Sequence, residues 1–150
     1  VIPEIEMPSH SEEVTTAYMC HKTGKGHADF SAPEPVKVTP SDGIRWQKPV
    51  VLLTNRSSYS ATNDFVNAMR QFPLVTVMGD RTGGGSGMPF SSELPNGWSV
   101  RFSACPVYGP DMEQLEFGIA PDIRVDMTSE DMARGLDTII EEARRYLSEQ

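Results

Sequence analysis

The chain has 150 residues, of which 38% are hydrophobic, so it is large enough for one domain with a real core. Its formal net charge of −8 at pH 7 argues against nucleic acid as a partner, because phosphate binding needs a basic stripe and none is visible. No apolar run could span a membrane, no signal peptide is recognisable, and no histidines or cysteines have metal-ligand spacing, so we expect neither metal nor cofactor.

The first third of the chain predicts short strands separated by turns. Residues 1–13 have the composition of a flexible lead-in, rich in Pro, Glu and Ser. A strand is expected over residues 15–21, turning at Gly24-Lys25-Gly26 into a partner near residues 27–30. Residues 36–38, which lie among prolines, predict a short edge strand.

Residues 49–79 predict a parallel βαβ unit with a right-handed crossover. Residues 49–54 have the continuous apolar character of a strand buried on both faces. A helix follows Ser60 and is stopped by Pro73, and residues 74–79 return as the second parallel strand. The helical spacing predicts one buried face, made of Ala61, Phe65, Ala68, Met69 and Phe72.

The last third predicts a hairpin and a terminal helix. Residues 88–90 and 98–102 flank an Asn96-Gly97 turn, which is a strong hairpin signal. A single final helix is expected to begin at Thr128 as its N-cap, with Asp131 three residues on. Its buried face is expected to contain Met132, Leu136, Ile139, Ile140, Ala143 and Leu147. We expect Cys20 and Cys105 to be free buried thiols, with a disulfide as the alternative.

The turn before the first helix carries the most informative pattern. An apolar, β-branched run stops at a cluster of small hydroxyl residues, and an amphipathic helix begins at once. Such a turn can present a serine hydroxyl beside the free N–H groups of a helix N-terminus, which stabilise the oxyanion formed in acyl transfer. Ser60 is therefore the candidate nucleophile, and the N–H of Ala61 is the candidate oxyanion donor. Ser57, Ser58 and Thr62 compete for the same role, and helix capping is the alternative function for Ser60.

Two further blocks give this turn a context. Residues 79–86 read Gly-Asp-Arg-Thr-Gly-Gly-Gly-Ser, and residues 118–123 read Gly-Ile-Ala-Pro-Asp-Ile. Together with Ser60-Ala61-Thr62-Asn63 they resemble, in order and spacing, the C-terminal half of the tail-specific (C-terminal-processing) and tricorn-core serine peptidases. In that family the blocks are a Ser-Ala-Ser-Glu-like stretch, a Gly-Glu-x-Thr-x-Gly-Lys-Gly stretch and a Gly-Ile/Val-x-Pro-Asp-Ile signature. The resemblance covers about residues 14–147.

The resemblance implies an α/β fold, namely part of a crotonase/Clp-protease-like spiral domain. Residues 14–150 would form the C-terminal portion of a serine peptidase catalytic domain, with the family's peptide-binding module and Gly-rich strand motif lying upstream. The implied reaction is acyl transfer to Ser60 followed by hydrolysis, on an unfolded or C-terminal peptide segment. The family also implies a periplasmic or exported location. We therefore expect the isolated chain to have little or no peptidase activity.

The lysine that serves as general base in the processing branch of that family is missing. The spacing from Ser60 places Gly85 at its position, and Gly24-Lys25-Gly26 precedes the nucleophile on the wrong side of the chain. The resemblance therefore implies the tricorn-type branch, in which an upstream histidine activates the serine and a glutamate assists. Glu116 is the candidate glutamate, and Glu113 is the fallback.

The other titratable residues have weaker claims. His10 lies in the lead-in, and His21 and His27 flank a hairpin, where we expect a structural or solvent-facing role for both; His27 is kept as the alternative base within the chain. Asp122 follows Pro121 and is expected to have a turn or cap role.

The glycine-rich stretch around Gly83, Gly84 and Gly85 lacks the Lys-Ser/Thr ending of a phosphate-binding loop. We interpret it as a mobile loop beside the substrate cleft, where an extended peptide can add as a strand. Two rival functions remain: a peptidase-like domain that has lost activity and binds peptide or an apolar ligand, and an acyl-CoA enzyme of the same fold. The second needs a CoA-phosphate site, for which this acidic chain shows no basic cluster.

Overall fold

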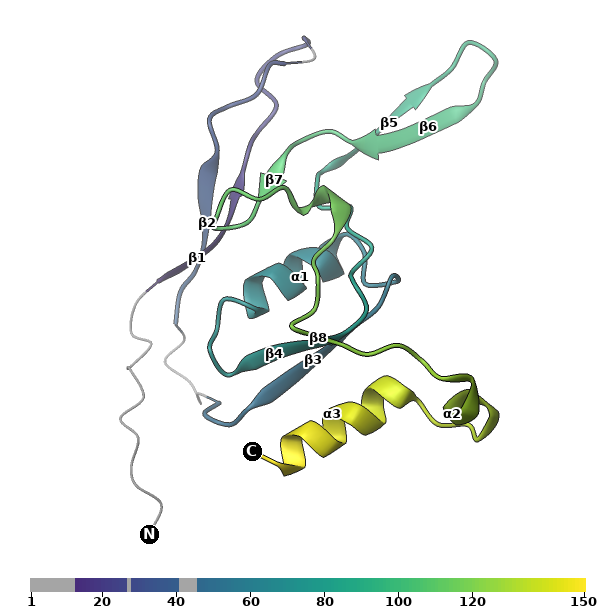
Figure 1. The fold of residues 1–150 in the computed structure, drawn as a ribbon. Coiled ribbons are helices and arrows are strands. Elements are labelled where there is room, and N and C mark those ends of the chain that lie inside the picture. The colour runs from purple at the N-terminus through teal and green to yellow at the C-terminus, as the bar shows by residue number, and fades with distance from the viewer. Residues whose placement is uncertain (1–12, 27, 41–45) are drawn as a thin grey trace.

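The computed structural model describes residues 13–26, 28–40 and 46–150. Its centre is a parallel sheet with the strand order β3-β4-β8, which lies between helices α1 and α3 (Figure 1). The three strands are β3 (Val50–Thr54), β4 (Val75–Gly79) and β8 (Ile123–Arg124), and the two helices are α1 (Ala61–Met69) and α3 (Thr138–Ser148). The predicted α/β class with a parallel βαβ unit is confirmed.

The buried core lies between α1 and the strands around it. Val66 of α1 packs with Val77 of β4, and Leu115 and Ile119 close the cluster from the segment before β8. Each such aliphatic side chain contributes about 1.5–3 kcal/mol when it is fully buried. By contrast, β3 is an edge strand of the described sheet and its Leu53 is exposed, so the expected burial on both faces is wrong.

A second sheet, antiparallel with the order β2-β1-β7, packs against α1 from the other side (Figure 1). Its strands are β1 (Val14–Met19), β2 (Glu34–Val38) and β7 (Val107–Tyr108). The predicted edge strand is confirmed as β2, and β2, rather than the described residues 28–30, is the main partner of β1. Among the described residues, an isolated bridge between Lys22 and Phe30 lies at the turn where this pairing was expected. The prolines of this region are tolerated because an edge strand leaves one side of its backbone unpaired.

The predicted Asn96-Gly97 hairpin is confirmed and is longer than expected. It pairs β5 (Pro89–Glu93) with β6 (Ser99–Ser103), and it projects from the body of the molecule (Figure 1). Gly97 has a φ of 81°, which the turn requires and which glycine adopts without strain.

The predicted buried face of α1 is wrong. The helix turns Asn63, Val66 and Asn67 inward, whereas Phe65 is 53% exposed. Polar residues can be buried here because their hydrogen bonds are satisfied: the side-chain amide of Asn67 donates to the carbonyl of Thr16 at 2.7 Å.

The single terminal helix is also wrong, because the chain forms two helices there. Thr128 caps α2 (Ser129–Ala133) as predicted, accepting a hydrogen bond from the Asp131 N–H. The chain then breaks at Gly135, whose φ is 71°, and Asp137 caps α3. This break changes the buried face: Ile139 and Ala143 are buried, while Met132, Ile140 and Leu147 are exposed.

The cysteines are free thiols, as expected: Cys20 is buried and Cys105 is half-buried. None of the helices in the described part of the chain is long and apolar enough to cross a bilayer. The predicted lead-in up to residue 12, with His10, and the candidate base His27 lie outside the described residues.

Candidate active site

Ser60 occupies a strained position between β3 and α1. Its φ of 58° and ψ of −123° are unusual for a residue with a side chain, and such backbone strain costs about 1–3 kcal/mol and clusters at functional sites. Ser60 stands at the N-cap position of α1, yet its side chain makes no capping hydrogen bond. The alternative of a plain helix cap is therefore wrong.

The competing hydroxyl residues have other roles. The Oγ of Ser58 accepts a hydrogen bond from the backbone N–H of Asn55 at 3.2 Å, and the Ser57 N–H donates to the Asn55 side chain. Both serines therefore stabilise the turn. Thr62 is exposed on α1. Only Ser60 among these four residues lines the cleft of about 300 Å³ that also borders Gly85, Arg101 and Ser103.

The start of α1 offers a free donor beside Ser60. The Ser60 N–H is engaged with the carbonyl of Gly84 at 2.8 Å, and the Thr62 N–H is directed to Tyr59. The N–H of Ala61 donates to no residue within the described ranges, and Ala61 is exposed. A free N–H at the positive end of a helix dipole is the kind of donor that an oxyanion needs.

The glycine stretch forms a pinned segment rather than the mobile loop that we expected. Gly84 and Gly85 are buried, and Gly83 donates to the carbonyl of Ser58 at 2.9 Å. One peptide group joins both sides of the site: the carbonyl of Gly84 accepts from Ser60, while the N–H of Gly85 donates to the carbonyl of Glu116 at 3.0 Å.

The glycines are also required sterically at two of these positions. Gly84 and Gly85 have φ values of 79° and 77°. A Cβ on Gly84 would collide with the backbone of Glu116, and one on Gly85 would collide with the ring of Tyr59. The position at which the missing lysine was expected therefore has no room for a side chain unless Tyr59 moves.

Glu116 lies close to this segment, on the short 3-10 helix η1 (Leu115–Phe117). Its half-buried carboxylate accepts a hydrogen bond from the Ser103 hydroxyl at 2.8 Å. Glu116 lines a second cavity, of about 420 Å³, which shares Phe102 and Ser103 with the cleft at Ser60. The structure thus brings Ser60 and Glu116 to neighbouring cavities with Ser103 common to both.

The remaining candidates lie elsewhere. Glu113 forms an ion pair with Arg70 and borders neither of these two cavities. His21 is on the surface, 3.9 Å from a carboxylate oxygen of Glu34. Asp122 has a structural role, but not the turn or cap role that we expected: its carboxylate accepts from the backbone N–H of Val77 in β4 at 2.8 Å.

A buried polar cluster between α1 and the glycine stretch was not predicted from the sequence. Asn63, Thr82 and Ser86 are each 1% exposed or less. The Asn63 amide donates to the Ser86 hydroxyl at 2.6 Å and to the carbonyl of Leu115 at 3.0 Å, and its oxygen accepts from Thr82. Thr82 in turn accepts from the Ile119 N–H. Asn63 and Thr82 belong to the sequence blocks at residues 60–63 and 79–86, and this was the signal from which the cluster could have been predicted.

Asp80 connects three segments around the end of β4. Its carboxylate accepts from the Arg81 N–H at 2.7 Å and forms ion pairs with Arg56 and Arg124 at 3.1 and 3.2 Å. The backbone hydrogen bond, followed by the two arginines, holds the pKa of the Asp80 carboxyl below its ordinary value.

Comparison with known proteins identifies related chains. Residues 7–125 match peptidase family S41. The crystal structure of a candidate peptidase from Parabacteroides merdae ATCC 43184 is 63% identical, with a TM-score of 0.82 over 91% of this chain and 43% of that one. Mature CPAF complexed with lactacystin is 19% identical, with a TM-score of 0.62 over 81% of this chain and 24% of that one, a likeness of fold alone.

A curated relative has a similar relation to the chain. An uncharacterized protein from Chlamydia muridarum is 24% identical over 135 residues, which are 83% of this chain and 22% of that protein. The chain therefore spans about a fifth of this relative and less than half of the Parabacteroides structure.

Proposed function

The chain belongs to peptidase family S41, and on that premise we propose that it carries the nucleophile half of a serine peptidase. Ser60 attacks the carbonyl carbon of a peptide bond, the amine leaves, and water hydrolyses the resulting acyl-enzyme. The observation that carries this proposal is the conformation of Ser60, which holds an uncapped hydroxyl in strained geometry at a cleft. Strain without a capping bond needs another reason, and nucleophilic catalysis is one.

The oxyanion of the tetrahedral intermediate is assigned to the N–H of Ala61. This donor is adjacent to Ser60 and is free of intramolecular partners in the described part of the chain. One oxyanion donor is worth roughly 10²–10³ in kcat. A second donor would come from the remainder of the parent protein.

The general base is assigned to a histidine assisted by Glu116 rather than to a lysine. Support comes from Gly85, where Tyr59 excludes a side chain, and from the fixed carboxylate of Glu116 in the cavity next to Ser60. His21 is exposed beside Glu34 and lines neither of the two cavities, so we assign this role to a histidine outside the described ranges. Glu116 would fix the tautomer of the imidazole and stabilise the imidazolium.

The substrate is proposed to be an unfolded or C-terminal peptide segment. The cleft beside Ser60 is lined in part by glycines, Gly85 and Gly87, which allow the backbone of an extended peptide to approach closely.

A fluorophosphonate probe tests the nucleophile in the full-length parent protein. We expect labelling at Ser60, and we expect Ser60→Ala to abolish it. Ser58→Ala is the matched control, because its hydroxyl belongs to the turn and labelling should be retained. Labelling that survives in Ser60→Ala would remove the assignment, and a parent that is never labelled would favour an inactive binding domain.

The isolated chain tests where the base lies. Residues 1–150 should not cleave unfolded casein, because groups that act as a unit lose most of their effect when one is missing. Cleavage that Ser60→Ala abolishes would show that the base is internal, and it would make His27 the candidate.

A further inference from the structure

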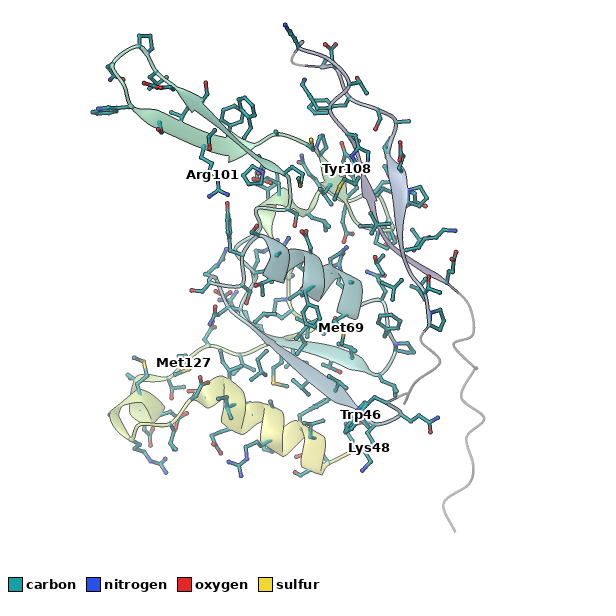
Figure 2. All side chains as sticks on the ribbon, turned by 180° about the vertical axis from the view of Figure 1, so that it is seen from behind. Trp46, Lys48, Met69, Arg101, Tyr108 and Met127 are labelled. Atoms are coloured by element: carbon teal, nitrogen blue, oxygen red, sulfur yellow. The ribbon has the colours of Figure 1, made fainter. Side chains whose placement is uncertain are left out.

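Arg101 lies on β6 at the cleft that contains Ser60. Its side chain leaves the hairpin on the side that faces the N-terminal end of α1 (Figure 2). Because side chains alternate along a strand, Arg101 shares a face with Ser103, which is hydrogen-bonded to Glu116. Arg101 is therefore a cation at the mouth of the proposed catalytic cleft.

Arg101 differs from the other arginines in having no partner. Every other arginine in the described ranges has a carboxylate or carbonyl partner, as Arg56 has with Asp80 and Arg145 with Glu142. No acceptor within those ranges is bonded to Arg101, and its cross-strand neighbour, Ser91, carries no charge. In a chain with 21 acidic residues and 13 basic ones, a cation that remains unpaired at a cleft is conspicuous.

We propose that Arg101 binds a carboxylate of the substrate next to the scissile bond. The guanidinium is planar and can donate two parallel hydrogen bonds to a carboxylate. The net charge of −8 would otherwise repel an acidic segment, and Glu116 adds a negative charge in the neighbouring cavity. The carboxylate is either an Asp or Glu side chain or the C-terminal α-carboxylate of the peptide. This inference rests on the proposed function of Ser60 and adds the substrate class.

Matched peptide pairs test the proposal in the full-length protein. One set differs only in Glu against Gln at a single position within three residues of the scissile bond, and a second set differs in a free against an amidated C-terminus. We expect the charged member of one set to have a kcat/KM about tenfold higher, as for a hydrogen-bonded charge pair at an exposed site. Arg101→Gln should bring this ratio close to one, mainly through KM, and Arg101→Glu should reverse it.

The control is Arg144→Gln, which makes the same charge change on the exposed side of α3 and should leave the preference intact. A response in the Glu/Gln set identifies a side-chain carboxylate, whereas a response in the acid/amide set identifies the α-carboxylate. If Arg101→Gln changes neither ratio while Ser60-dependent cleavage persists, the proposal is wrong. A lower Tm of Arg101→Gln together with unchanged ratios would also make the proposal wrong. It would indicate that Arg101 binds a carboxylate of the parent protein and not one of the substrate.

A binding measurement separates this proposal from the peptidase assignment. The dissociation constants of the same peptides for the Ser60→Ala variant do not depend on catalysis. A tenfold tighter binding of the charged peptide that Arg101→Gln removes would support the carboxylate site even if Ser60 is not the nucleophile. Equal affinities for both members of each pair would overturn it, even if the fluorophosphonate probe labels Ser60.

Discussion

Ser103 contacts the Glu116 carboxylate from β6. Its hydroxyl donates to Glu116 at 2.8 Å, from a strand that joins the cleft at Ser60 to the neighbouring cavity. In the proposed mechanism the Glu116 carboxylate orients an imidazole and must itself be oriented, and one hydrogen bond contributes about 1 kcal/mol to this. We interpret Ser103 as a positioning residue.

Removing this hydrogen bond should affect turnover more than binding. Ser103→Ala should lower the kcat of the parent protein about tenfold with little change in KM, because the lost interaction is felt mainly in the transition state. Ser103→Thr, which keeps the hydroxyl, should restore most of the activity. Steady-state kinetics on one peptide measures both effects. A full kcat in Ser103→Ala, or a failure of the threonine variant to recover, would argue against the positioning role.

The sequence predicted the place of Ser60 but not that of Ser103, and the reason is the range of the interactions. The strand, turn and helix around Ser60 follow one another directly, so local pattern is sufficient to locate the serine. The contact of Ser103 with Glu116 joins the hairpin to η1, and it depends on tertiary packing that leaves no local signal. The free state of Arg101 is invisible for the same reason, since a missing partner is a property of the folded chain.

Among the elements, α1 is fastened to its surroundings by buried polar groups as well as by Val66. Asn63 joins α1 to the glycine segment through Thr82 and Ser86, and to η1 through the carbonyl of Leu115. No buried side-chain N or O atom in the described residues lacks a hydrogen-bond partner. The cluster therefore fixes the elements that contribute Ser60 and Glu116 relative to one another.

Breaking this cluster should be costly. Asn63→Ala should lower the free energy of unfolding by about 3 kcal/mol, because it leaves several buried groups without partners. Urea denaturation measures the change, with Thr62→Ala as the control, since Thr62 is exposed on the same helix and should cost less than about 1 kcal/mol. A loss for Asn63→Ala no larger than for the control would show that the cluster is not important for stability.

The errors in the predicted helices also arise from features of the folded chain that the spacing of apolar residues does not reveal. The buried face of α1 was predicted from apolar spacing. In the structure, hydrogen bonds allow Asn63 and Asn67 to face inward, and Phe65 therefore lies on the exposed side of the helix. The terminal helix was predicted as continuous because apolar residues keep helical spacing across Gly135. A glycine inside a periodic pattern can be tolerated or can end a helix, and here its positive φ ends it.

Across the whole molecule, Asp80 ties the ends of the central strands together. It links the turn after β3, through Arg56, to β8, through Arg124. The pKa of its carboxyl is lowered in the folded state, chiefly by the Arg81 N–H. Its contribution to stability is therefore present above the unfolded pKa, about 3.9, and is lost as the pH falls through the folded value.

The pH dependence of stability tests this role. Wild type should be more stable than Asp80→Asn between pH 5 and 8, and the difference should shrink as the pH falls below about 4. Chemical denaturation at a series of pH values measures it. High salt should reduce only the part that the two arginines contribute, because the backbone hydrogen bond is not screened in the same way. A difference that is constant down to pH 2 would contradict the lowered pKa of Asp80.

The peptide group between Gly84 and Gly85 has a mechanical consequence. Its carbonyl holds the backbone of Ser60 and its N–H holds the backbone of Glu116, and the group itself is planar and stiff. The distance between the backbones of Ser60 and Glu116 thus depends on the covalent geometry of this peptide group and on its two hydrogen bonds. Because one peptide group takes part in both hydrogen bonds, each bond polarises and strengthens the other. Rotation of this group would break the hydrogen bonds to Ser60 and to Glu116 at the same time. The backbone hydrogen bonds of this group therefore act beside the buried cluster of Asn63, and together they set the spacing of Ser60 and Glu116.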